Sequence, residues 1–210
     1  MSSPAPRGRP RSFDRQAALA AATRLFWDRG YEATSISDLT QAMGIRPPSL
    51  YAAFGDKRAL FEEVVAGYQA TYAAFGTRAF EEEPTVRAGV ARMLHEAAAE
   101  YTAPGRPHGC LIISAAANCA TPEVHDALQA IRNANIERLR TLIAAAVARG
   151  EEPAQADPAT LARFTGAVLQ GMSQQARDGA GRAELEPVAA AAMLAWPAAG
   201  PPAGAAAVGR

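Results

Sequence analysis

The 210-residue sequence lacks the features that mark membrane, secreted and β-sheet proteins. No apolar run reaches the roughly 18 residues that a membrane span requires, and residues 1–12 carry arginines without the apolar core of a signal peptide, so we expect a cytoplasmic protein with no membrane partner. The two cysteines should stay reduced inside a cell, which excludes a structural disulfide. Alternating runs of valine and isoleucine are nearly absent while alanine dominates, and this composition predicts an all-helical fold.

The sequence also lacks an overall charge, but its charges are unevenly distributed. Residues 1–58 hold nine basic and five acidic residues, whereas the other 152 residues hold 12 basic and 16 acidic ones. A basic N-terminal part joined to an acidic body is typical of a DNA-binding protein whose second domain has a separate task.

Residues 35–54 carry the pattern of two short helices joined by a tight turn. Ser35 is suited to cap the first helix, with Asp38 at the capping-box position, and Gly44 accepts the left-handed backbone of a helix stop. Pro47 opens the second helix at a position where its missing N–H costs nothing. The buried stripe of the first helix is expected to be Ile36, Leu39 and Met43.

The second helix of this pair should bury one face and expose the other. Leu50 and Phe54 are four residues apart and are expected to face the core, while Ser49 and Tyr51 point elsewhere. A short second helix with exposed polar groups is typical of a helix-turn-helix, which lays that helix in the DNA major groove.

The rest of the chain predicts a larger helical bundle. We expect a helix-turn-helix domain over 13–57, a bundle domain over 58–197, and disordered segments at 1–12 and 198–210, with about nine helices in all. One long helix over 57–83 should join the two domains. The other helices are expected at 13–29, 85–102, 110–120, 122–150, 157–178 and 184–196.

Short segments at fixed spacing within residues 13–65 carry a family resemblance. They are RGYEATS at 29–35, DL at 38–39, AMGI at 42–45, SLY at 49–51, FGDK at 54–57 and LF at 60–61. Together they resemble the tetracycline-repressor (TetR) family of bacterial transcription regulators. The resemblance implies a homodimer on a roughly twofold-symmetric double-stranded DNA operator, usually a repressor that a small-molecule effector releases.

The resemblance also implies roles for individual residues. Ser49 would face the groove, while Tyr51 and Lys57 would contact backbone phosphates, which suits a hydroxyl donor and a charged ammonium. The predicted DNA-binding set is Ser35, Arg46, Pro47, Ser49, Tyr51 and Lys57, with Arg7, Arg9 and Arg11 of the N-terminal arm.

Arg46 departs from the family, which usually has a small hydroxyl residue at that place. Pro47 and Pro48 remove two backbone donors that a phosphate could use, so Arg46 either replaces them, reads guanine directly, or is a solvated turn residue. The three arm arginines either enter the minor groove or form a solubilising tail.

The bundle domain contains aromatic and methionine side chains that fit either a plain core or a ligand cavity. Asn135 interrupts an apolar stripe, where it would orient a ligand or be satisfied by backbone or water. The ligand candidates are Tyr72, Phe75, Met93, Tyr101, Asn135 and Phe164, together with Cys110.

Cys110 has a second possible role as a thiol sensor of electrophiles or oxidants. Gly109 lets the chain turn into a helix that begins at Cys110, and a helix N-terminus lowers a thiol pKa. His108 or Cys119 would assist. The alternatives are a small buried hydrophobic residue, or a metal site of these three side chains, for which the ligand spacing is not tight.

Two other classes of function remain as alternatives. A cysteine-dependent enzyme would pair Cys110 with His108 or His125, but no third orienting group is evident and the helix-turn-helix would have no use. We therefore expect no enzyme, cofactor or metal. A constitutive DNA-binding protein with a purely structural second domain would bind an operator that no small molecule relieves.

The last two helices are predicted to form the dimer interface. Gly166 and Gly171 allow close approach of helices, and the face of Val188, Ala192 and Trp196 has no obvious partner within the chain. Two such helix pairs would make a four-helix interface.

Overall fold

The chain folds into helices alone over the part that the structure describes, which confirms the all-helical prediction. The structure is a computed structural model that describes residues 13–116 and 119–197. The arm and the tail, with Arg7, Arg9 and Arg11, lie outside the described residues. The described helices are α1 (Arg15–Arg29), α2 (Ile36–Met43), α3 (Pro47–Phe54), α4 (Lys57–Ala70), α5 (Phe75–Glu82), α6 (Val86–Tyr101), α7 (Leu111–Ser114), α8 (Pro122–Ala148), α9 (Pro158–Arg177) and α10 (Arg182–Leu194).

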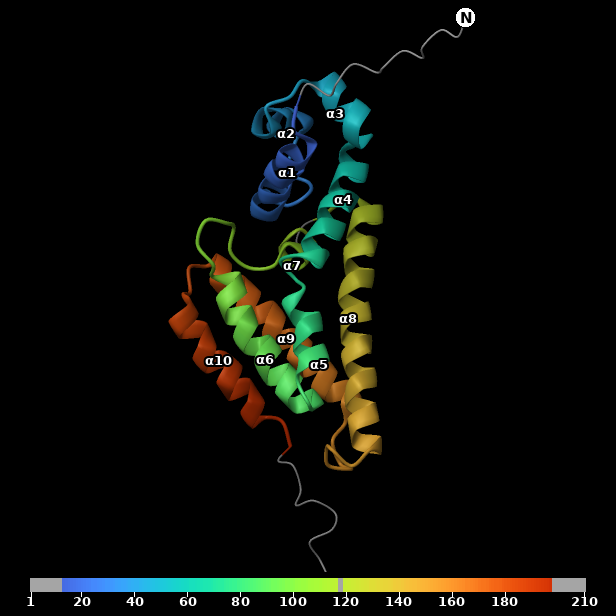
Figure 1. Cartoon of the computed structure of the whole chain (residues 1–210), viewed down its shortest axis with the longest axis vertical. Helices are drawn as coiled ribbons and strands as arrows, with labels where there is room; N and C mark the ends of the chain where they lie inside the picture. The colour runs from blue at the N-terminus through green and yellow to red at the C-terminus, as the bar shows by residue number, and fades with distance from the viewer. Residues whose placement is uncertain (1–12, 117–118, 198–210) are drawn as a thin grey trace, which may run out of the picture.

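The first three helices form at one end of the molecule through signals that lie within a few residues of each other (Figure 1). Ser35 and Asp38 make the reciprocal hydrogen bonds of a capping box at the start of α2. Gly44 ends α2 in the left-handed conformation at φ 64°. The predicted helix-turn-helix is therefore confirmed from its first cap to its last turn.

The helix-turn-helix is held to α4 by packing and by one ion pair. Leu50 and Phe54 of α3 are buried as predicted, in the core that α1 and α4 complete. The Arg15 guanidinium donates to both Glu63 carboxylate oxygens, at 2.6 and 2.7 Å, and lies 4.4 Å from the centre of the Phe54 ring. α1, α3 and α4 thus form one unit.

The single helix predicted over 57–83 is wrong, because the chain breaks between α4 and α5. The Tyr68 carbonyl accepts hydrogen bonds from the N–H groups of Thr71 and Ala73, at 3.3 and 3.1 Å, instead of one from residue 72. The turn places Phe75 in the core, edge-on to the Tyr101 ring at 6.2 Å. Packing of α5 against α6 therefore outweighs the local preference for one continuous helix.

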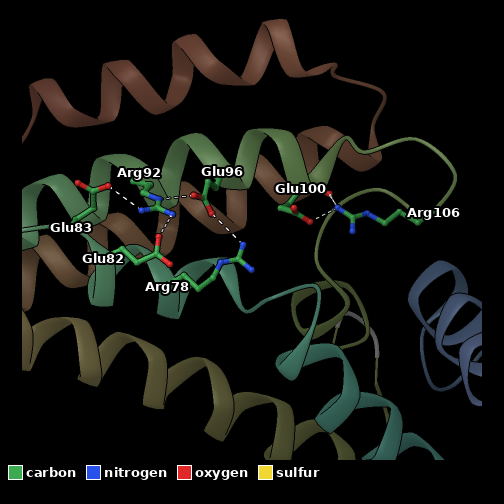
Figure 2. A network of polar contacts seen from close by, with 7 residues as sticks. All are labelled: Arg78, Glu82, Glu83, Arg92, Glu96, Glu100 and Arg106. Carbon is green, nitrogen blue, oxygen red and sulfur yellow. Dashed lines mark hydrogen bonds and ion pairs between the residues drawn. The ribbon is translucent and has the colours of Figure 1, made fainter. Parts of the chain in front are cut away.

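Ion pairs hold α5 against α6 after this break (Figure 2). Arg92 of α6 donates to Glu82 at 2.7 Å and Glu83 at 3.1 Å, and also to Glu96 of its own helix at 2.7 Å. Arg78 of α5 lies 3.8 Å from the other Glu96 oxygen. This network fixes the orientation of α5 relative to the bundle.

The remaining helices form the bundle. α7 is a single turn that ends at Ser114, shorter than the helix predicted over 110–120. α8 is the long helix along one side, α9 and α6 pack against it, and α10 packs on α6 and α9 at the opposite side of the bundle (Figure 1). Asp157 caps α9 with Pro158 in its first turn, as predicted. No helix in the described ranges is both long and apolar enough to cross a bilayer.

Candidate functional site

The outward face of α3 presents the polar side chains that the sequence predicted for DNA. The side chain of Tyr51 is 51% exposed, although it is large and aromatic. Arg46 and Pro47 at the start of α3 are exposed, and Ser49 is half-buried. A guanidinium has no acceptor and cannot cap a helix N-terminus, and the exposed Arg46 side chain is therefore open to an acceptor on a partner.

Lys57 lies beside this face, at the first position of α4, which Asp56 caps. Its Nζ atom is 4.2 Å from the centre of the Tyr31 ring. Burial lowers the pKa of Lys57, while the neighbouring carboxylate of Glu32 acts in the opposite direction. The Tyr31 ring therefore holds the Lys57 ammonium in place at the start of α4.

Ser35 differs from the other predicted DNA contacts because its hydroxyl is already engaged. Its Oγ atom accepts from the Asp38 N–H at 3.1 Å and donates to the Asp38 carboxylate at 2.5 Å. The hydrogen bonds that the Ser35 hydroxyl and the Ser35 N–H donate to the carboxylate lower the pKa of Asp38. The cap is the role of Ser35 that the geometry defines, and its contact with DNA stays a prediction.

The helix-turn-helix end is connected to the bundle by hydrogen bonds that the sequence analysis missed. The Glu32 carboxylate accepts from the N–H and the hydroxyl of Thr121, both at 2.7 Å, at the start of α8. These two bonds are the main cause of a lowered Glu32 pKa. The partners lie 89 residues apart, so no local pattern could have indicated the pair.

The end of α1 is fastened to the bundle at two further places. Trp27 Nε1 donates to the Gly109 carbonyl at 3.2 Å, and Arg177 of α9 donates to the carbonyls of Trp27 and Asp28. Gly109 has a φ of 75°, and a Cβ there would lie 2.7 Å from the Ser173 carbonyl oxygen. The loop can approach α9 this closely only with glycine.

A cavity of about 220 Å³ lies within the bundle, among α4, α5, α6, α8 and α9. Its wall brings together five of the seven predicted ligand candidates, namely Phe75, Met93, Tyr101, Cys110 and Asn135. The end of α4 also contributes, through Tyr68 and Gln69. The cavity therefore touches the same helix that begins at Lys57.

Tyr72 and Phe164 were predicted as ligand candidates but are not part of the cavity wall. Tyr72 instead packs 5.1 Å from the Trp27 ring and 5.0 Å from the Arg106 guanidinium. Phe164 is half-buried on α9, against the core. Neither residue contributes to this cavity, and a ligand contact of Tyr72 or Phe164 stays a prediction.

Cys110 lines the cavity, but its thiol is not activated. It is only 8% exposed, and burial raises its pKa above the ordinary value despite the neighbouring Tyr68 hydroxyl. The prediction of a lowered pKa is wrong, because α7 is a single turn and desolvation outweighs its dipole.

The two side chains that were predicted to assist Cys110 have other partners. His108 Nδ1 lies 3.2 Å from the Ala176 carbonyl, and Cys119 Sγ lies 3.7 Å from Glu32 and from the Thr121 carbonyl. Burial also raises the pKa of Cys119. Within the described ranges, no three His, Cys, Asp or Glu side chains are placed to hold a metal ion.

The predicted dimer residues divide into two groups. Trp196 is 3% exposed and Ala192 is also buried, because α10 packs on α6 and α9 of the same chain. The premise that these two residues lack a partner within the chain is therefore wrong. Gly166 faces α8 and lines the cavity, where an added Cβ would lie 3.2 Å from Ile136. Gly171 has open space around it and Val188 is exposed, so these two remain available.

Comparisons with known proteins agree with both halves of this geometry. Residues 18–64 match the family described as bacterial regulatory proteins, tetR family, and residues 88–191 match the tetracyclin repressor-like C-terminal domain. The chain is 39% identical over 197 residues to the HTH-type transcriptional repressor ComR of Escherichia coli, covering 91% of this chain and 92% of ComR.

A second repressor and a solved structure show the same similarity. The HTH-type transcriptional repressor BdcR of Escherichia coli is 35% identical over 173 residues, covering 82% of this chain and 83% of BdcR. A cysteine mutant of the TetR family transcriptional regulator CifR, complexed with 26-bp double-strand operator DNA, superposes with a TM-score of 0.86 at 42% identity. That match covers 90% of this chain and all of the other.

Proposed function

The chain belongs to the tetR family of bacterial regulatory proteins, and on that premise we propose that it is a transcriptional repressor released from its operator by a small molecule. The observation that carries the proposal is one helix, α4, which has Lys57 beside the exposed face of α3 at one end and cavity-lining Tyr68 at the other. A ligand in the cavity therefore contacts the element that carries a predicted DNA contact.

On the DNA side, α3 is proposed to enter the major groove. Ser49 and Arg46 face the base edges, while Tyr51 and Lys57 contact backbone phosphates on either side. CifR, a similar regulator that has been solved with operator DNA, supports the proposal that this chain binds double-stranded DNA. A protein with this task acts in the cytoplasm, and no catalytic step is assigned to it.

Release requires that the effector interact differently with the DNA-bound and the free arrangement. Tyr68 of α4 packs edge-on against Trp27 of α1 at 4.9 Å, so a shift of Tyr68 moves both helices that hold α3. The Glu32–Thr121 bonds and the Trp27–Gly109 bond hold the helix-turn-helix end in a fixed position relative to the bundle. We propose that effector binding changes this relative position.

The operator-binding form is proposed to be a homodimer. Two recognition helices must reach successive major grooves, about one helical turn apart. Two predicted interface residues lie on the surface of the last two helices: Gly171 of α9, where an added Cβ would meet no atom within 4 Å, and the exposed Val188 of α10. Sedimentation velocity should show a dimer at micromolar concentration, and a monomer under those conditions would overturn this part of the proposal.

The test of the repressor proposal separates it from constitutive DNA binding. A palindromic operator is first selected from random DNA by its binding to the protein. Small molecules that release the operator are then sought by fluorescence anisotropy, with Ala73→Phe as a matched variant that narrows the cavity wall without touching α3. We expect wild type to be released by at least one compound and Ala73→Phe to stay bound.

Two results would contradict the proposal. If no DNA sequence is preferred over random DNA, the protein does not read an operator. If wild type and Ala73→Phe are released equally by every active compound, the cavity is not the effector site. Cys110→Ser should respond like wild type, because the buried thiol needs no ionisation in this scheme.

A further inference from the structure

The wall of the cavity carries positive charge that no acidic side chain balances. Arg132 of α8 and Arg138 of α8 line it, whereas the described residues of the wall include no aspartate or glutamate. Arg138 is exposed and donates to the Thr77 hydroxyl at 3.0 Å. Arg132 is half-buried, and its one hydrogen bond to a described residue goes from Nη1 to the Ile112 carbonyl at 3.2 Å.

Two other partly buried arginines of the chain are paired with carboxylates. Arg15 has both oxygens of Glu63, and Arg92 has three glutamates. Within the described ranges, no carboxylate lies within ion-pair distance of Arg132, and burial lowers the pKa of its guanidinium. A guanidinium has five N–H donors in a fork that matches a carboxylate, so most of the donors of Arg132 are left for a ligand.

The other polar groups of the cavity do not supply a compensating negative charge. Burial raises the pKa of Tyr68, Tyr101 and Cys110 above their ordinary values, so all three stay protonated and neutral at neutral pH. The rest of the wall is mostly apolar, with Phe75, Met93 and Leu139 among its members. The cavity thus combines an apolar body with one cationic side.

We propose that the effector is an amphipathic carboxylate whose carboxylate binds the Arg132 guanidinium and whose apolar part fills the cavity. The volume of about 220 Å³ suits a molecule on the order of ten non-hydrogen atoms, such as a phenyl-substituted or medium-chain fatty acid. A carboxylate held bidentately by arginine is a strong, charge-assisted interaction.

Arg132 also provides a route from this ligand to the DNA-binding end, a step that rests on the proposed repressor function. Its hydrogen bond to Ile112 joins α8 to α7, and α7 packs against both α1 and α4. A carboxylate that competes for the guanidinium weakens this link. The ligand then loosens the contact between α8 and the two helices that support α3.

The binding part is tested by calorimetry on the full chain without DNA. The probes are phenylacetate and octanoate, each compared with its neutral isostere, phenylacetamide or octanamide. At least one acid should bind wild type about tenfold or more tightly than its amide, as expected for a hydrogen-bonded charge pair. Arg132→Gln should remove this preference while the affinity for the amide stays unchanged.

Two further variants keep the inference falsifiable. Arg132→Lys should retain part of the preference, because it keeps the charge without the fork, and Arg138→Gln should leave the preference intact. Far-UV circular dichroism checks that each variant is folded, and the comparison of acid with amide needs no variant at all. Equal binding of each acid and its amide to wild type, no binding of either acid at millimolar concentration, or loss of the preference in Arg138→Gln alone would each overturn the assignment.

Operator binding is measured separately, so the two proposals can fail independently. If the protein binds the acids but selects no operator, the repressor proposal fails and the carboxylate site stands. If it selects an operator that other compounds release while no acid binds, the carboxylate site fails and the repressor proposal stands.

Discussion

Leu50 of α3 and Leu142 of α8 are the same residue type in two differently packed regions. Leu50 is 0% exposed, enclosed by the core that α1, α3 and α4 share. Leu142 is half-buried, with one side facing the cavity. The DNA-binding end thus has a fully packed core and a polar surface, whereas the bundle contains a cavity whose wall includes Arg132.

The difference separates a part that must stay rigid from a part that can accept a ligand. The packed core around Leu50 keeps the exposed side chains of α3 at fixed positions. The bundle is less tightly packed because it contains a cavity, and a cavity of this kind is where a small molecule can bind. The three predictions below test this contrast.

Truncation of a leucine should cost much more at the DNA-binding end than at the cavity. We expect Leu50→Ala to lower the free energy of unfolding by about 2–5 kcal/mol, because it leaves a new hole in a closed core. Leu142→Ala should lower it by about 1–2 kcal/mol, since one side of that residue already lacks packed neighbours. Urea denaturation of both variants checks this. Equal losses would mean that the cavity is closed in solution.

Lys57→Ala should weaken DNA binding for every sequence alike and change stability little. A phosphate contact positions the protein without reading bases, so the loss should also reduce the slope of log K against log salt by about one. Tyr51→Phe should have a smaller effect of the same kind. Anisotropy titrations at several salt concentrations measure both, with Lys57→Arg as the control that keeps the charge. A change in base preference at full affinity would show that the role is misassigned.

The smallest effect is expected at the junction between the two regions, and it depends on pH. Hydrogen bonds from Thr121 lower the pKa of Glu32 below its ordinary value of 4.5, so they favour the charged carboxylate in the folded state. Their stabilising effect is present above about pH 4.5 and disappears as the pH falls through the lower folded pKa.

The measurement is the difference in melting temperature between wild type and Glu32→Gln across this range. Wild type should be more stable near neutral pH, and the difference should shrink on acidification. Glu81→Gln, at an exposed position on α5, serves as the control and should show no such trend. A difference that is constant with pH would mean that the Glu32 charge does not hold the junction.

The helix-turn-helix could be predicted almost residue by residue, while the bundle could be predicted only as a set of helices. Capping by Ser35, the stop at Gly44 and the proline start of α3 were all correct because each acts within three or four residues. The helix over 57–83 was wrong because its break serves a contact between Phe75 and Tyr101, 26 positions further along the chain.

The site residues divide along the same line. Tyr51 is exposed as its spacing indicated, and five ligand candidates do meet at the cavity. Tyr72 and Phe164 lie outside the cavity wall, and Ala192 and Trp196 are buried within the chain. Periodicity shows which residues share a helix face but not which neighbour that face meets. Arg132 was not noticed at all, since an arginine on a long helix has no local signal of burial.

The sequence by itself determined the all-helical class, the helix-turn-helix and the polar face of α3, since these follow from composition, capping and side-chain spacing over short distances. Only the tertiary structure decided the break after α4, the Glu32–Thr121 junction, the neutral thiol of Cys110 and the arginine in the cavity wall. The physical reason is that desolvation and ion pairing depend on residues distant in sequence, so a charge or thiol acquires its properties only when the elements around it have packed.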